Sequence, residues 1–335
     1  MTDDGTVFLL FDRLDPHPPI RFPAPMNRPL AIGTRGSPLA LWQAREVRRR
    51  LADALGVEAS DADLLLPITV LRTSGDRIKG ELSAFGGKGL FTRELEQALL
   101  DRRIDVAVHS MKDVPTVGQP ELAIGAILPR PDPRDAFLSP VAPTLLDLPE
   151  GATVGSASIR RRAQAARLRP DLRFVLLRGN VGTRCQRLSE GVCDATFLAC
   201  AGLDRLGEGA LITERIPLDT MLPAPAQGAV GVEFRRDDTE VADALRRLDH
   251  APTRRAVSAE RGFLRALDGS CRTPIAALAE GDRFRGEVLS PDGTLAFAAD
   301  ETLGGDPDAA GFAIGQALRE EIAGRIVFDE GTPAL

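Results

Sequence analysis

The chain has 335 residues. A single hydrophobic core usually stops growing at about 250–300 residues, so we expect two or three domains. Apolar residues make up 43% of the chain, and no apolar run approaches the ~20 residues that span a bilayer. The net charge of −6 argues against a general nucleic-acid binder. Aspartates precede the short apolar run 7–11, whereas an export signal has positive charge before a longer apolar run and a mitochondrial presequence avoids acidic residues. This start of the chain therefore predicts a cytoplasmic protein.

The chain begins with residues 1–29, whose prolines and lack of periodicity predict a flexible N-terminal arm. Ser37 and Pro38 are residue types preferred at the N-cap and first position of a helix, and Gly56 is a typical end. The glycine-rich segment 74–89 predicts a mobile loop or lid. The regular elements predicted up to residue 109 are strands over 30–34, 64–72 and 105–109 and helices over 38–55 and 91–100.

From residue 153 strands and helices alternate, which predicts α/β layers with largely parallel sheets. The tail after residue 250 differs, because its short strands follow one another and predict a smaller α+β domain. The predicted elements are strands over 153–155, 173–177, 195–199, 230–234, 275–279, 284–289 and 295–298, and helices over 159–168, 183–189, 238–248, 253–267 and 309–326.

Several cationic side chains stand where a predicted strand ends. Arg35 and Ser37 follow the first strand, where free N–H groups at a helix start attract anions, although for this segment alone a simple capped helix is the favoured interpretation, because capping signals are common. Lys112 and Asp113 follow the strand ending at His109, and they suit a carboxylate clamp with an acid–base group or a surface ion pair. For His109 we expect a hydrogen-bonded core role.

Arginines recur in the same way further along the chain. Arginines at the starts of helices can also be interpreted as solvated side chains. This interpretation suits Arg178 poorly, because that residue lies between a buried strand and a glycine turn. No nucleotide-binding glycine motif is present. The sequence therefore predicts a cleft for a small molecule with several carboxylates or phosphates, bound by Ser158, Arg160, Arg161, Arg178 and Arg184 in addition to the first two clusters.

Cys271 lies in the turn 269–274 beside Arg272, and positive charge favours the reactive thiolate. A free surface thiol is the alternative. The other cysteines, Cys185, Cys193 and Cys200, sit among apolar residues, and we expect small buried hydrophobic side chains. Because the four show no zinc-like spacing, we predict no metal site.

From Leu30 to the C-terminus the chain resembles the porphobilinogen deaminase family. The resemblance rests on GTRGSPLALWQA, GGKGLFTRELE, HSMKDVPT, SIRRRAQ, LRGNVGTR, LPAPAQGAVGVE and GSCRTPIAA, seven segments in the family's order. It implies a deaminating transferase of tetrapyrrole (porphyrin, haem) biosynthesis, which joins four porphobilinogen molecules head to tail into hydroxymethylbilane and releases ammonia. It also implies a dipyrromethane cofactor held by a thioether to Cys271.

By the same resemblance Asp113 is the catalytic carboxylate, and the acetate and propionate groups bind Arg35, Ser37, Lys112, Ser158, Arg160, Arg161, Arg178, Arg184 and Arg205. Lys88 belongs to the family's active-site loop, and Phe91 lies near the cofactor. Two positions depart from the family pattern: Ala226 stands where glycine is frequent, which we expect to restrict the hinge slightly, and Ala84 stands where a loop lysine is expected.

The resemblance implies an α/β fold of two lobes, similar to those of periplasmic binding proteins, around a cleft. The expected domains are a first lobe over 30–128 and 229–246, a second over 133–222, and an α+β domain over 251–328 that carries the cofactor cysteine. We expect a monomer that binds its small-molecule substrate, porphobilinogen, and neither nucleic acid nor membrane. The alternative is a non-enzymatic two-lobed anion-binding protein, which leaves Cys271 and the Lys112–Asp113 pair unexplained.

Overall fold

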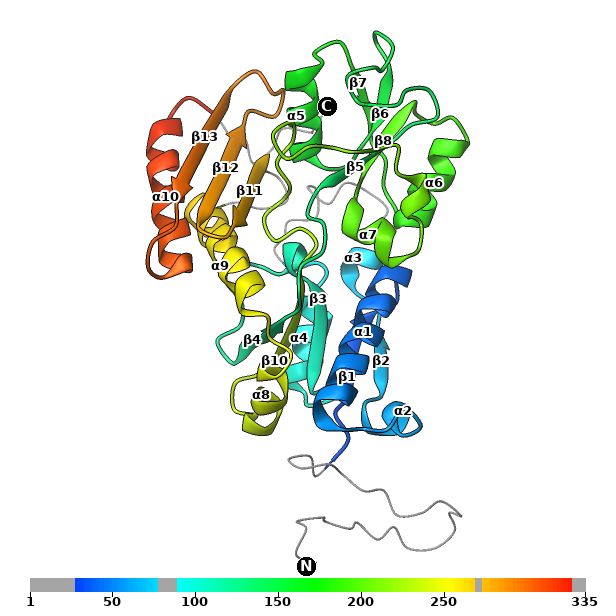
Figure 1. The fold of residues 1–335 in the computed structure, drawn as a ribbon, viewed down its shortest axis with the longest axis vertical. Coiled ribbons are helices and arrows are strands. Elements are labelled where there is room, and N and C mark those ends of the chain that lie inside the picture. Colours follow the sequence, from blue (N-terminus) through cyan, green and yellow to red (C-terminus); the bar gives the residue numbers. More distant parts are fainter. Residues whose placement is uncertain (1–27, 78–88, 269–272, 327–335) are drawn as a thin grey trace, which may run out of the picture.

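The computed structural model describes residues 28–77, 89–268 and 273–326. Its strands form two five-stranded sheets and one three-stranded sheet, each with its own hydrophobic core. In Figure 1 the first lobe lies at the bottom, the second at the top, and the third domain beside both. The predicted fold class, two α/β lobes with a smaller α+β domain, is confirmed.

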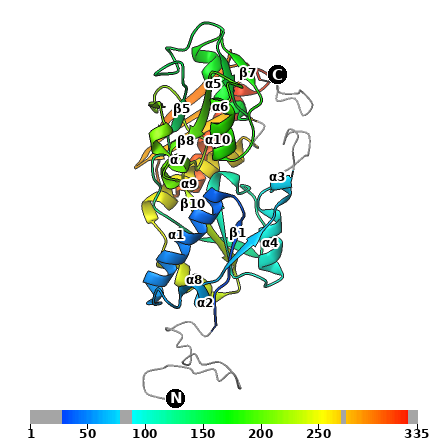
Figure 2. The same ribbon diagram turned by 90° about the vertical axis from the view of Figure 1, so that its right-hand side faces the viewer.

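The first lobe is a mixed sheet with strand order β2-β1-β3-β10-β4. β1 pairs in parallel with β2 and β3, whereas β10 returns from late in the chain and runs antiparallel between β3 and β4. Figure 2 shows α1 and α4 on opposite faces of this sheet. The elements are β1 (Ile32–Arg35), α1 (Pro38–Leu55), α2 (Ala62–Leu65), β2 (Ile68–Leu71), α3 (Ser74–Arg77), α4 (Arg93–Leu100), β3 (Val106–Ser110), a 3-10 turn (Met111–Asp113), β4 (Leu122–Ile127), β10 (Val230–Arg235) and α8 (Thr239–Arg246).

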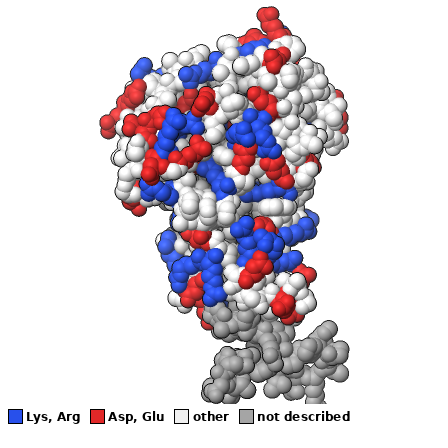
Figure 3. Space-filling view, in the orientation of Figure 1, with Lys and Arg blue, Asp and Glu red and all other residues white. Residues whose placement is uncertain are grey.

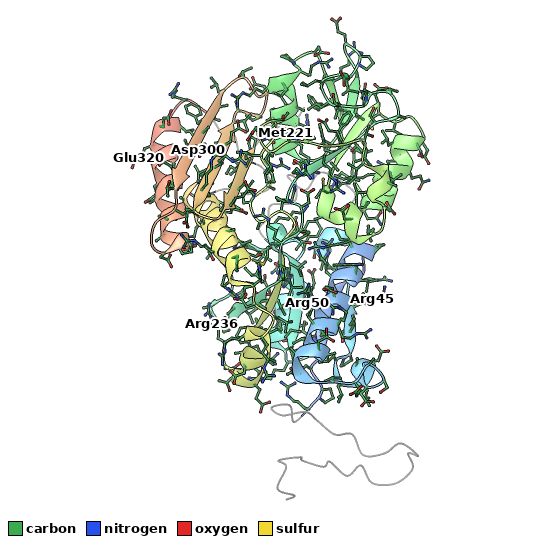
Figure 4. All side chains as sticks on the ribbon, in the orientation of Figure 1. Arg45, Arg50, Met221, Arg236, Asp300 and Glu320 are labelled. Atoms are coloured by element: carbon green, nitrogen blue, oxygen red, sulfur yellow. The ribbon has the colours of Figure 1, made fainter. Side chains whose placement is uncertain are left out.

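The signals at the two ends of α1 act as predicted. The Ser37 hydroxyl accepts a hydrogen bond from the N–H of Ala40 at 3.2 Å, and the N–H of Gly56 caps the last turn with φ of 70°. Between these caps an apolar stripe packs into the core of the lobe, while exposed Arg45 projects away from it (Figure 4). The carboxyl end of β1 is thereby joined to the helix at a defined angle.

The second lobe repeats the plan with strand order β7-β6-β8-β5-β9. β6 is parallel to β7 and β8, and β5 is antiparallel to β8 and β9. Its core includes the tilted ring pair Phe137 and Phe197, with centroids 6.1 Å apart. The elements are β5 (Asp135–Leu138), β6 (Thr153–Gly155), α5 (Ile159–Leu168), β7 (Arg173–Val175), α6 (Val181–Ser189), β8 (Ala195–Ala199), α7 (Cys200–Arg205), a 3-10 turn (Gly209–Leu211) and β9 (Glu214–Arg215).

The third domain is an antiparallel sheet, β11-β12-β13, packed against two helices. The helices approach closely at Gly311, where an added Cβ would lie 2.0 Å from the carbonyl oxygen of Ala259. Glycine is therefore required for this helix contact. The elements are α9 (Ala251–Ala266), β11 (Ile275–Glu280), β12 (Arg283–Leu289), β13 (Ala296–Thr302) and α10 (Pro307–Ile322).

The structure differs from the sequence-based expectations in several places. The predicted strand 64–72 was wrong at its start, because residues up to Leu65 close the helix α2 and only Ile68–Leu71 pairs with β1. The sequence analysis missed β4, β5 and β9, and both large sheets are mixed where largely parallel sheets were predicted. In the first sheet the antiparallel strand is β10, and in the second it is β5; each pairs with strands that are distant in sequence.

Of the predicted arm, residues 1–27 lie outside the described chain. Arg28 belongs to the fold, since its guanidinium pairs with Asp105 at 2.7 Å and Asp238 at 3.1 Å. Of the predicted lid, Ser74–Arg77 form the short helix α3, and residues 78–88 lie outside the described chain. Within the described residues, no helix is long and apolar enough to cross a bilayer.

Candidate active site at the junction of the two lobes

Asp113 lies in the 3-10 turn Met111–Asp113, which directly follows β3; we call this segment the Asp113 turn. The turn is held by the returning chain, because the N–H of Met111 donates to the carbonyl oxygen of Ala229 at 3.0 Å. Gly231 makes room for Met111, whose sulfur would lie 2.1 Å from a Cβ at that position. The side chain of Asp113 is 26% exposed. The fold thus presents a carboxylate at the sheet edge where α/β proteins bind ligands.

Arg35, the last residue of β1, reaches the same sheet edge. Its Nη1 lies 3.8 Å from Oδ2 of Asp113, and its guanidinium carbon lies 4.2 Å from the centroid of the Phe91 ring. The first distance is too long for a hydrogen bond, so the attraction is between charges only. The structure therefore brings together three predicted site residues from separate elements, Arg35, Phe91 and Asp113.

His109, at the start of this region, has the core role expected of it. It is buried, and its Nε2 lies 3.1 Å from Oε2 of Glu233 on the neighbouring strand β10. This pair helps to join β3 to the strand that returns from late in the chain.

Lys112 connects the two lobes electrostatically. Solvent reaches its side chain, yet protein surrounds it, as expected for a lysine in a recess. Burial lowers the pKa of Lys112, Asp113 raises it, and the positive charges of Arg161 and Arg184 lower it further. Figure 3 shows basic and acidic side chains interspersed over both lobes on this face, with some basic side chains between the lobes.

Arg160 and Arg161 lie at the start of α5, and both bind a buried carboxylate that the sequence analysis did not single out. Nη1 of Arg160 is 2.7 Å from Oδ2 of Asp135, and Nη2 of Arg161 is 2.7 Å from Oδ1. Burial alone would raise the pKa of Asp135, but the two guanidiniums outweigh it and hold the pKa below its ordinary value. Gln227, from the segment between the lobes, adds a bond of 2.9 Å. One carboxylate thus offsets one of the two positive charges within the protein.

Ser158 and Ser37 occupy equivalent positions in the two lobes. Each is the N-cap of the helix after a strand, and the hydroxyl of Ser158 accepts a hydrogen bond from the N–H of Arg161 at 3.4 Å. The capping interpretation is therefore realised at both positions. Each hydroxyl keeps its own proton, which remains free to be donated to an anion.

Arg178 and Arg184 form no ion pair with a carboxylate among the residues that the structure describes. Nη1 of Arg178 is buried and has no hydrogen-bond partner in the structure. Arg184 donates from Nε to the carbonyl oxygen of Gly179 at 2.9 Å. Burial, followed by the charges of Arg161 and Arg178, lowers the pKa of Arg184 to about 10. We call Lys112, Arg178 and Arg184 the cationic cluster.

The cationic cluster fits a ligand with several carboxylates. Like charges that lower one another's pKa, beside an unpartnered buried N–H group, are stabilised by an anion at that place. Around Lys112 the charges of Arg161 and Arg184 face two carboxylates, Asp113 and Asp135. Asp135 is already bound by Arg160 and Arg161. A polycarboxylate cofactor therefore suits the residues present.

Arg205, at the end of α7, lies apart from the cationic cluster. Its Nη2 donates to the carbonyl oxygen of Gly228 at 2.8 Å, and its guanidinium carbon is 5.4 Å from the centroid of the Trp42 ring. Burial lowers its pKa to about 10. Together with Trp42, Gln43 and Arg50 it lines a cavity of about 190 Å³ beside the segment that joins the lobes at residues 128–131. Arg50 is labelled on α1 in Figure 4. The structure does not place Arg205 against Asp113.

The remaining cysteines of the described chain are free thiols. Cys193 and Cys200 are buried, as predicted, whereas Cys185 is only half-buried. Burial raises the pKa of all three, that of Cys200 to about 12, so these thiols are poor nucleophiles. Two predicted site residues, Lys88 and Cys271, lie outside the described residues. In the part of the chain that the structure describes, no three His, Cys, Asp or Glu side chains are grouped to hold a metal ion.

Comparisons with known proteins give one consistent family. A family model described as "Porphobilinogen deaminase, dipyromethane cofactor binding domain" matches residues 30–243, and one described as "Porphobilinogen deaminase, C-terminal domain" matches residues 254–324. A curated relative named porphobilinogen deaminase, from Paracoccus denitrificans (strain Pd 1222), is 52% identical over 314 residues, covering 92% of this chain and 98% of the relative.

Similarity to solved structures is weaker. The VFT2 domain of BvgS from Bordetella pertussis (double mutant) is 16% identical with a TM-score of 0.40, over 66% of this chain and 85% of that domain. The periplasmic aliphatic sulphonate binding protein SsuA from Escherichia coli is 14% identical with a TM-score of 0.39, over 72% of this chain and 71% of that protein. Likenesses this weak carry no argument about fold or function.

Proposed function

The chain belongs to the porphobilinogen deaminase family, and on this premise we propose that Asp113 is its catalytic carboxylate and Cys271 its cofactor attachment residue. The activity is that of hydroxymethylbilane synthase: four porphobilinogen molecules are condensed head to tail into hydroxymethylbilane, with release of ammonia. The cofactor is dipyrromethane. A non-enzymatic anion-binding protein is not favoured.

The charge balance at the junction of the lobes supports the proposed site. Each pyrrole of substrate or product carries two carboxylates, so the bound molecules bring many negative charges. The cationic cluster offers an unpartnered buried N–H at Arg178 and crowded positive charges at Lys112 and Arg184. This uncompensated positive charge is the observation that carries the proposal. We propose that Arg35, Ser37 and Ser158 add donors from the adjoining strand and helix ends.

When bound, the dipyrromethane cofactor supplies the primer on which the chain of pyrroles is built. We propose that Asp113 accepts hydrogen bonds from pyrrole N–H groups and stabilises the positive charge that develops as ammonia leaves. A carboxylate held in advance at that place needs little reorganisation during the reaction. Phe91, stacked near Arg35, lies where it can shield these charges from water.

The other site residues expected from the family resemblance do not belong to the cationic cluster. Arg160 and Arg161 are each bound to Asp135, so we propose that they shape the second lobe and that only their remaining N–H groups face a ligand. Arg205 is proposed to act near the segments that join the lobes, where it contacts Gly228. We propose Lys88 as a residue of the active-site loop.

We also propose the three domains with the boundaries expected from the sequence, 30–128 with 229–246, 133–222 and 251–328, because each contains one of the three sheets and a large hydrophobic cluster packed against it. The protein is proposed to be a cytoplasmic monomer without nucleic-acid or membrane partners. Light scattering of the purified protein near 35.9 kDa supports the monomer, and twice that mass contradicts it. Cell fractionation tests the compartment.

The proposed role of Asp113 is tested by Asp113→Ala. We expect turnover of porphobilinogen to be abolished while circular dichroism and thermal unfolding stay near those of the parent protein, because the side chain is partly exposed and lies outside the cores. The matched control is Asp171→Ala, which removes an arginine-paired aspartate far from the junction of the lobes. Near-normal product formation by Asp113→Ala sinks the catalytic assignment.

A further inference from the structure

Helix α9 of the third domain reaches across to the Asp113 turn through Arg261. Its Nη1 donates to the carbonyl oxygen of Val114 at 2.8 Å, and its Nη2 donates to that of Pro115 at 2.7 Å. A longer contact of 3.4 Å joins Nη1 to the carbonyl oxygen of Met111. One guanidinium therefore contacts backbone on both sides of Asp113.

The local sequence explains why this segment needs an outside donor. Pro115 restricts the residue before it, and Val114 accordingly has extended backbone angles of −82° and 124°. The 3-10 turn ends at Asp113, and the chain continues in extended conformation through Val114. Arg261 donates to the carbonyl oxygens of Val114 and Pro115 in this segment directly after the turn.

An arginine suits this task better than a lysine. The planar guanidinium presents several N–H donors in a fixed arrangement and can hold two adjacent carbonyl groups at once, whereas a lysine ammonium is a single flexible point. Burial lowers the pKa of Arg261 to about 10, so the side chain keeps its proton and all its donors at neutral pH. On the next turn of the helix, Arg265 instead binds Asp308 of α10, at 2.7 and 2.9 Å, within the third domain.

We propose that Arg261 is a positioning residue for the reaction: by clamping the Asp113 turn to the third domain, it holds the Asp113 carboxylate at the reacting centre. The inference rests on the proposed catalytic role of Asp113. The start of the turn is held by the bond from the N–H of Met111 to Ala229, and Arg261 holds the segment directly after the turn. The helix that carries Arg261 also leads, a few residues later in the sequence, to Cys271.

The test uses the full-length protein with its cofactor and compares Arg261→Met, Arg261→Lys and the control Arg265→Met. We expect Arg261→Met to lower kcat about 10- to 100-fold with KM within about 3-fold, because a small misplacement of a reacting group costs that much. Arg261→Lys should recover part of kcat, since one donor remains. Arg265→Met should keep kcat within about 3-fold. Intact mass should show the cofactor retained in all three.

A double mutant separates positioning from a general loss of structure. If Arg261 acts through Asp113, adding Arg261→Met to Asp113→Glu should lower kcat further by less than about 2-fold, because coupled residues are not additive. Full additivity, or a wild-type kcat in Arg261→Met, overturns the inference. If Arg261→Met does not fold, Arg261→Lys decides: a lowered kcat at normal KM supports the clamp, and a wild-type kcat overturns it. A near-normal rate for Asp113→Ala would instead refute the role of Asp113 itself.

Discussion

Two pairs of arginines in the second lobe come from the same sequence pattern and meet different surroundings. Arg160 and Arg161 both bind the buried carboxylate of Asp135, which neutralises much of their charge. Arg178 and Arg184, placed equivalently after the next strand, form no ion pair with a carboxylate of the described chain. Each pair holds one buried N–H group without a partner, at Nε of Arg160 and Nη1 of Arg178, so the two pairs differ in their counter-charge. The first pair is bound within the fold, and we propose the second pair for a ligand.

The difference shows that an arginine after a strand does not by itself mark a binding site. Its role depends on whether the protein supplies a counter-charge, because a buried cation without one is costly. A site for a polycarboxylate therefore appears where positive charge remains unbalanced. The following predictions separate the two pairs, beginning with the largest expected effect.

Asp135→Asn should destabilise the protein most. The amide keeps the shape of the side chain but removes the negative charge that pairs with the two buried guanidiniums. We expect a loss of about 3–5 kcal/mol in the free energy of unfolding of the second lobe, measured by urea titration with circular dichroism. The pH dependence has a defined sign. Because folding lowers the pKa of Asp135, its stabilisation is present above the ordinary aspartate pKa of about 3.9 and is lost as the pH falls below it.

The control for this prediction is Asp300→Asn, which removes a carboxylate from the exposed partner Arg283. Exposed ion pairs contribute little, so we expect no resolved change in stability. Equal effects of the two substitutions would contradict the structural role assigned to Asp135. Asp135→Asn should also lack the part of acid unfolding that the parent protein shows below pH of about 4.

Arg178→Met should have the opposite effect to Asp135→Asn: it should lower activity and change stability little. Removing one charged hydrogen bond to a bound carboxylate costs about 1.5–3 kcal/mol, which is about 10- to 100-fold in kcat/KM. The free energy of unfolding should change by less than about 1 kcal/mol, since an unpartnered buried group is removed. Arg187→Met, an exposed position on α6, is the activity control. A stability loss as large as that of Asp135→Asn would show that Arg178 has a structural role, like Arg160 and Arg161.

The smallest effect is expected of Ala226→Gly, in the segment that joins the lobes. Ala226 is buried and has a φ of 61°, a conformation that costs a residue with a side chain about 1 kcal/mol and explains why glycine is frequent there in the family. Removing the methyl group loses about 0.8 kcal/mol of burial. These contributions nearly offset, so thermal unfolding should show a change below about 1 kcal/mol. A larger change would place more strain in this segment than its backbone indicates.

The sequence predicted well those features that depend on neighbours along the chain. The cap at Ser37, the end at Gly56 and the helix 159–168 follow from local residue types, and the structure has them at those positions. Arg178 was expected not to be a freely solvated side chain, because a strand and a glycine turn enclose it, and its Nη1 is buried. In contrast, β10 could not be predicted as the partner of β3, since the pairing joins residues that lie far apart in the sequence.

The missed functional residues share a physical cause. Asp135 is a lone carboxylate on a short strand that the sequence analysis did not predict, and its arginine partners lie two elements later. Arg261 is one arginine among several on a long helix, and its partners are backbone carbonyl groups, which no side-chain pattern reveals. Both become visible only when tertiary packing brings their partners together.

The most direct test of the account is the intact mass of the denatured, purified protein. We predict an excess that matches two linked pyrroles, retained in Cys185→Ser and lost in Cys271→Ser. Cys185 is the proper control because it is the most accessible of the three cysteines in the described chain, and burial raises its pKa. An unmodified mass that persists after incubation of the parent protein with porphobilinogen would contradict the account.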